Sequence, residues 1–168
     1  MTLDYTIAIL TALAAAFKWL YEYSQKLKWE KNKFLLEQLE KFQSQETTQV
    51  MEKLLDWNFI SVTIKGSTYK VNDAMLFEAL QTHNNKHSFS QTEVALRKTF
   101  DDYFDNLTKM ILLCKSKLIS EKNFKLFYEY WLNILSGRKQ SKSRELKEQI
   151  HNYLDFYGYD HLLQFIKK

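Results

Sequence analysis

Residues 90–136 read SQTEVALRKTFDDYFDNLTKMILLCKSKLISEKNFKLFYEYWLNILS, and this stretch decides the fold. Ser90 followed by Glu93 is a capping box, which marks the start of a helix. We expect that helix to continue to Leu118, and a second one, capped by Ser120, over 121–136. Apolar residues recur in both at helical spacing. They are Val94, Leu96, Phe100, Tyr103, Phe104, Leu107, Met110, Ile111 and Cys114, then Phe124, Phe127, Tyr128, Trp131, Leu132 and Leu135. The sequence therefore predicts helices that pack on one another.

The composition of the whole chain agrees with long helices. Among 168 residues there are no prolines and three glycines, so a sandwich, a barrel or a glycine-rich nucleotide-binding sheet, all of which need many turns, is disfavoured. The apolar fraction of 45% excludes intrinsic disorder. The single cysteine, Cys114, excludes a disulfide framework and a cysteine-rich zinc site.

One strand-like region interrupts the helices. β-forming residues run from Phe59 to Ile64 and from Thr68 to Val71, with Lys65-Gly66-Ser67 between them. This pattern predicts a β-hairpin over 58–71, which must pack on helices because an isolated hairpin is marginal in water. Helices are also expected over 74–82, 144–157 and 160–167.

The N-terminal segment is the most apolar part of the chain. Tyr5 to Phe17 contains no charged residue. Extended to Tyr23, a helix reaches about 28 Å, close to the roughly 30 Å hydrocarbon core of a bilayer. Its ends would be held by interfacial side chains, with the ammonium of Lys18 reaching the headgroups. The predicted membrane-interface residues are Lys18, Trp19, Tyr21 and Tyr23. The sequence thus predicts a transmembrane helix over 1–23.

Most of the net charge of +4 follows that segment directly. Five lysines and two glutamates lie between Lys18 and Lys33. Membrane proteins keep such basic residues on the cytoplasmic side, whereas a nucleic-acid binder spreads them over a docking face. We therefore expect a single-pass protein of the bacterial inner membrane that contacts lipid, with a basic juxtamembrane stalk over 24–44 and a cytoplasmic helical domain over 45–168.

Two other interpretations of the N-terminal segment stay open. Ala14 and Ala16 could imitate a signal-peptide cleavage site, although no basic region precedes them. The segment could instead be a helix buried in a soluble assembly.

Self-association is expected through one ridge of small residues in this part of the chain, and a short paired stalk stays open as a second contact. Ala8, Ala12 and Ala16 are spaced by four, and such small residues let helix backbones approach closely. Leu35, Leu39 and Phe42 form a short stripe that could pair two stalks. Polar residues at the next positions in that register, Glu46 and Gln49, argue against a sustained coiled coil.

One stretch carries a family resemblance. Residues 100–131, FDDYFDNLTKMILLCKSKLISEKNFKLFYEYW, resemble a group of uncharacterised bacterial helical domains that often follow one N-terminal membrane helix. The resemblance covers roughly residues 90–136 and rests on hydrophobic pattern. It implies a helical, non-catalytic cytoplasmic module and assigns no functional residue.

No set of residues predicts catalysis. His83 and His87 have a spacing that can hold zinc on a helix, but the residues between them indicate a polar loop. Asp101, Asp102 and Asp105 lie close together, but Asp101 follows Arg97 and Asp102 follows Lys98 at an interval of four, which favours salt bridges on a solvated face. Cys114 lies within an apolar stripe, and the C-terminal aromatic residues are best explained as core. We expect no metal, no cofactor and no enzymatic activity.

The strongest candidate binding site is a basic loop. Arg138, Lys139, Lys142 and Arg144 place four cations in seven residues, just before a predicted helix N-terminus. A helix N-terminus favours anions, so a phosphate-bearing ligand is one interpretation and a solvated loop is the other.

The functional prediction has three versions. The first is a membrane-tethered, non-catalytic, homo-oligomeric interaction module that binds partner proteins. The second is a membrane-anchored sensor or effector that binds an anionic ligand such as a nucleotide messenger, by analogy with bacterial defence and signalling proteins. The third is a soluble helical oligomer.

Overall fold

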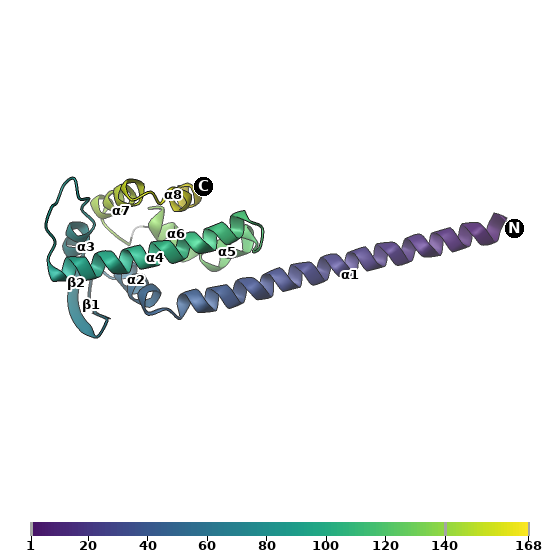
Figure 1. Ribbon diagram of the computed structural model, residues 1–168, viewed down its shortest axis with the longest axis horizontal. Helices are drawn as coiled ribbons and strands as arrows, with labels where there is room; N and C mark the ends of the chain where they lie inside the picture. The colour runs from purple at the N-terminus through teal and green to yellow at the C-terminus, as the bar shows by residue number, and fades with distance from the viewer. Residues whose placement is uncertain (1, 140, 168) are drawn as a thin grey trace.

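The computed structural model describes residues 2–139 and 141–167, with side chains from Tyr5 onward. Within these ranges the chain forms helices and one two-stranded sheet. In order they are α1 (Thr2–Gln43), α2 (Glu46–Asp56), β1 (Phe59–Ile64), β2 (Ser67–Asn72), α3 (Asp73–Ala79), α4 (Gln91–Lys115), α5 (Glu121–Phe127), α6 (Glu129–Leu135), α7 (Arg144–Phe156) and α8 (Asp160–Lys167). Most of α1 extends away from a domain formed by the other elements (Figure 1).

Helix α4 is the centre of that domain, because α2, α3, α5 and α8 all contact it. Its capping box forms as predicted: the Ser90 hydroxyl accepts from the Glu93 N–H, and the Glu93 carboxylate accepts from the Ser90 N–H at 2.8 Å. The predicted stripe is buried except for Val94, which is 53% exposed. The residues from Ser90 therefore form the central core helix.

The predicted hairpin is confirmed. Strands β1 and β2 pair antiparallel from Phe59–Asn72 to Ile64–Ser67. Lys65 and Gly66 both have positive φ, at 50° and 82°, as a two-residue hairpin turn requires. The buried side chains Val62, Ile64 and Val71 attach the sheet to the helices.

The helix predicted over 121–136 is two helices in the structure. Tyr128 stands between α5 and α6 with a non-helical φ of −112° and ψ of 14°. Its side chain is buried, and its hydroxyl lies 3.0 Å from that of Tyr103 and donates to Glu52 at 3.2 Å. The change of direction leaves Phe127, which the periodicity placed in the core, 56% exposed.

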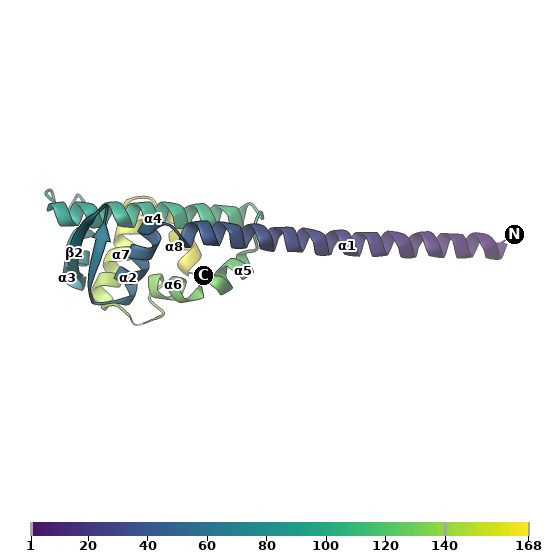
Figure 2. The same ribbon diagram turned by 90° about the horizontal axis from the view of Figure 1, so that it is seen from below.

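Only the end of α1 belongs to the core. Leu35, Leu39 and Phe42 are buried, and the Phe42 ring contacts those of Tyr103 and Tyr128 at centroid distances of 5.8 and 5.4 Å. The stripe expected to pair two stalks thus packs inside its own domain. Figures 1 and 2 show the rest of α1 projecting freely in both views, in one helix with no boundary between the predicted span and stalk.

The predicted membrane helix is wrong. Among the described residues, no helix has an apolar stretch long enough to cross a membrane. The physical reason lies in the sequence after Phe17: Lys18 and Glu22 interrupt, and Trp19, Tyr21 and Tyr23 are amphipathic. The fold class is therefore mainly helical with one small hairpin, without the membrane-spanning part. The single-pass location in a bacterial inner membrane is overturned by the same finding.

Two neighbouring leucines test how α1 joins the domain. Leu35 is fully buried and Leu36 is 51% exposed. We expect Leu35→Ala to lower the free energy of unfolding by about 2–5 kcal/mol, because it leaves a core cavity. Leu36→Ala, the matched control, should change it by about 0.5 kcal/mol or less. Urea unfolding measures both values, and equal losses would contradict this packing.

Candidate functional site

The free part of α1 is the most unusual surface of the molecule. From Tyr5 to Phe34 every residue is exposed. The large apolar side chains that are at least half exposed there are Tyr5, Ile7, Ile9, Leu10, Leu13, Phe17, Trp19, Leu20, Tyr21, Tyr23 and Trp29. Contiguous apolar surface on this scale marks an interaction site.

The apolar residues of this part contain a coiled-coil seam with alternating spacing of four and three. We call it the α1 seam: Ile9, Leu13, Ala16, Leu20, Tyr23 and Leu27. Glu30 takes the next position and Phe34 the one after it. The opposite side of the helix carries polar residues at intervals of seven, namely Thr11, Lys18, Gln25 and Asn32. A two-sided pattern of this kind is what helix pairing requires.

The α1 seam was missed in the sequence because only the register of Leu35, Leu39 and Phe42 was followed backward. Those residues face the domain, and their register meets Asn32 and Lys28. The α1 seam follows a different register, which includes Phe34 in place of Leu35. Testing each of the seven registers separately would have found it.

The predicted small-residue ridge lies partly on this seam. Ala8, Ala12 and Ala16 are exposed, and Ala16 belongs to the seam while Ala8 and Ala12 lie beside it. Residues spaced by four turn progressively away from a seam whose mean spacing is 3.5 residues. The ridge and the seam therefore cross at Ala16.

The predicted membrane-interface residues are also on the free part of α1. Lys18 lies 3.9 Å from the Glu22 carboxylate, and the Trp19 ring stacks on Tyr23 at 5.6 Å between centroids. Tyr21 is 65% exposed. Their predicted role depended on a spanning helix.

The four cations of the basic loop do not converge. The ammonium of Lys142 is buried and donates to Asp73 Oδ1 and to the Trp57 carbonyl, both at 2.7 Å. The Arg144 guanidinium, on the first turn of α7, donates to Glu148 at 2.8 Å. Lys139 lies 3.4 Å above the centre of the Tyr130 ring, and Arg138 is exposed. Each cation thus has a different environment, and no shared anion site is formed by them.

Arg97, which the sequence pattern predicts on a solvated face beside Asp101, instead occupies a central, buried position. Arg97 is buried and donates to the Ala79 and Gln81 carbonyls at 2.7 and 2.6 Å, which closes the end of α3. Its guanidinium lies 4.2 Å from the Phe89 ring centre. A buried arginine with several acceptors is a structural clamp.

The aspartates also take separate roles. Asp101 accepts from the Tyr153 hydroxyl at 2.6 Å, and burial raises the pKa of its carboxyl. Asp102 lies 3.6 Å from the Lys98 ammonium, the spacing-of-four pair that the sequence predicts, and Asp105 is exposed. The three carboxylates therefore do not form one site.

The histidines do not converge either. His83 hydrogen-bonds Tyr157, while His87 is exposed. Within residues 2–139 and 141–167 no group of three or more potential ligands could hold a metal ion.

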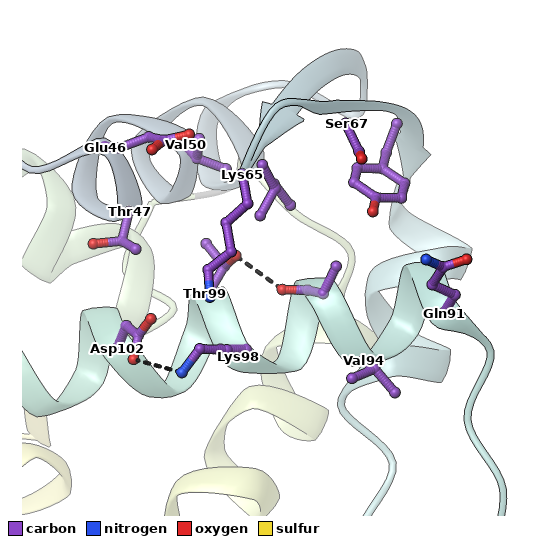
Figure 3. Close-up of a pocket in the computed structure, with 13 residues that line it drawn as sticks. Glu46, Thr47, Val50, Lys65, Ser67, Gln91, Val94, Lys98, Thr99 and Asp102 are labelled. Atoms are coloured by element: carbon purple, nitrogen blue, oxygen red, sulfur yellow. Dashed lines mark hydrogen bonds and ion pairs between the residues drawn. The ribbon is translucent and has the colours of Figure 1, made fainter.

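One pocket lies between α2, the hairpin turn and α4 (Figure 3). Its volume is about 270 Å³, below the roughly 300–1,000 Å³ of common ligand pockets. Val50, Val94 and Ala95 give it an apolar lining. Two of its polar groups are already used, since Lys98 pairs with Asp102 and the Thr99 hydroxyl donates to the Ala95 carbonyl. The pocket thus lacks a convergent set of polar groups.

Comparison with known proteins finds no matching family model, no similar curated protein and no similar solved structure. The resemblance to uncharacterised bacterial helical domains stays a prediction.

Substitution of Lys142 tests its structural role. Lys142→Met keeps the apolar stem and removes the donor, so we expect a loss of about 1.5–3 kcal/mol in the free energy of unfolding. Arg144→Met, two residues away, should change that free energy by far less than Lys142→Met does, because Arg144 and its partner Glu148 are exposed. Thermal and urea unfolding of both variants measure this, and an unaltered Lys142→Met protein would contradict the buried ion pair.

The reactivity of Cys114 tests the packing of α4. Burial raises the pKa of its thiol to about 12. At pH 8 only about one thiol in ten thousand is then ionised, and the thiolate is the reactive form. We expect Ellman's reagent to leave the native protein unmodified and to react at once after unfolding in guanidinium chloride. Rapid reaction of the folded protein would show that Cys114 is accessible.

Proposed function

We propose that this protein is a non-catalytic interaction module that assembles copies of itself through the free part of α1. The observation that carries the proposal is the run of exposed apolar side chains between Tyr5 and Phe34. A helix in a protein gains most of its stability from packing its apolar face against other residues. In a single chain, the apolar side chains of α1 over this length have no such packing. A partner that covers this face removes the cost of exposing it.

A second copy fits this face because the α1 seam has the pattern of a helix that pairs with its equal. Leu13, Leu20 and Leu27 repeat at intervals of seven, with Ile9, Ala16 and Tyr23 four residues before each of them. A two-fold interface places the same patch of both copies in contact, and a heptad seam is complementary to itself. The proposed homo-oligomer therefore forms through the α1 seam, which shares only Ala16 with the alanine ridge.

The contacts made by the candidate chemical groups support a non-catalytic role. Lys142 is held by Asp73, Asp101 by Tyr153, and Cys114 is kept protonated by burial. Each group already has a structural explanation. The alternative of an anionic-ligand sensor has less support, because the basic loop does not gather its cations at one point.

A substitution in the seam tests this function. Leu20 is 53% exposed in a single copy and lies at the centre of the α1 seam. Leu20→Glu removes a core leucine from each copy, at about 2 kcal/mol or more apiece. We therefore expect the dissociation constant to rise by roughly a thousandfold.

Sedimentation equilibrium on the full chain measures the association. Gln25→Glu is the matched control, because it adds the same charge on the polar side of α1 and should leave the oligomer intact. A wild-type chain that is monomeric at high micromolar concentration, or that forms only polydisperse aggregates, would contradict the proposal.

A further inference from the structure

The charges on the free part of α1 are distributed very unevenly. Four lysines and one glutamate lie between Lys26 and Lys33, whereas Tyr5 to Phe17 has no charged residue. Lys26 and Lys33 each have an i,i+4 glutamate at 4.0 Å, and both pairs are largely exposed. One end of the α1 seam is therefore strongly basic and the other is uncharged.

A parallel pair would bring like charges together. The basic ends of the two copies would lie side by side, and Lys26 of each copy would flank Lys31 of the other across the seam. Glu30 is on the seam, so two carboxylates would face each other in the core. Two alanines at position 16 would also form a thin layer and two tyrosines at position 23 a thick one, with only the Leu20 layer between them. The parallel arrangement is thus disfavoured by both charge and size.

We propose that two copies pair the free parts of α1 antiparallel, with Leu20 of one copy level with Ala16 of the other. This inference rests on the self-association proposed above. The same register sets Leu13 against Tyr23 and Leu27 against Ile9, and Glu30 meets the uncharged Thr6. Leu13 then packs on the larger Tyr23, Leu20 on the smaller Ala16 and Leu27 on Ile9, and no two charged residues share a core layer.

The antiparallel register also separates the basic ends. Their centres lie about 23 residues apart along the pair, or about 35 Å at 1.5 Å per residue. That distance exceeds three Debye lengths of about 8–10 Å at ordinary ionic strength, so their mutual repulsion is screened. Because α1 first contacts its own domain at Asn32, which accepts a hydrogen bond from the Asn123 side chain at 2.6 Å, the two domains lie at opposite ends of the paired helices. The assembly is a spacer with one domain at each end.

Disulfide cross-linking of the full chain tests the direction. In the proposed register Ile9 of one copy lies level with Leu27 of the other, within disulfide reach. An equal mixture of Ile9→Cys and Leu27→Cys chains should give a cross-linked dimer on mild oxidation, with residues 9 and 27 joined as read by peptide mass spectrometry. Ile9→Cys chains on their own should form no cross-linked dimer, because the thiols at position 9 of the two copies would be about 27 Å apart. Cys114 is buried and stays out of the exchange.

The outcomes separate this inference from the proposed function. Sedimentation of each cysteine variant first confirms that it still self-associates. Dimers that join residue 9 to residue 9, or 27 to 27, would overturn the antiparallel arrangement and leave self-association standing. Monomeric wild-type protein would overturn both.

Discussion

Burial of Leu35, Leu39 and Phe42, the last against Tyr103 of α4 and Tyr128 between α5 and α6, determines how the long helix is used. These three side chains occupy one face over the last turns of α1. Because they pack into the domain, the helix leaves it in a defined direction, and the apolar side chains from Tyr5 to Phe34 stay exposed. The N-terminal part of the helix therefore extends away from the domain instead of folding back onto it.

Buried polar contacts make the junction between α1 and the domain rigid. The hydroxyls of Tyr103 and Tyr128 lie 3.0 Å apart within the aromatic cluster, and Tyr128 also donates to Glu52. Burial raises the pKa of both tyrosines, so both hydroxyls stay protonated and able to donate. Groups buried and bonded in this way allow few alternative packings, which keeps the junction between α1, α2 and α4 in one geometry.

The uneven charge along α1 can be interpreted in two ways, depending on what surrounds the helix. After an apolar segment, a block of lysines resembles the flank of a membrane helix. Along a helix that pairs with its equal, the same block instead sets direction, because like charges are separated when the two copies run antiparallel. The difference lies in the tyrosines, tryptophan and Lys18 that follow Phe17, which are too polar for a hydrocarbon core and suited to a helix surface.

Local patterns were enough to place most of the elements. The Ser90 capping box, the hairpin turn at Lys65-Gly66 and the breaks near Ser44 and Gly158 depend on contacts between residues close in sequence, so they could be read directly. The turn at Tyr128, the ion pair of Lys142 with Asp73 and the clamp at Arg97 could not, because their partners are distant in sequence. The choice between the two faces of α1 was also tertiary: both stripes are apolar and helical, and only the folded domain shows which one it covers.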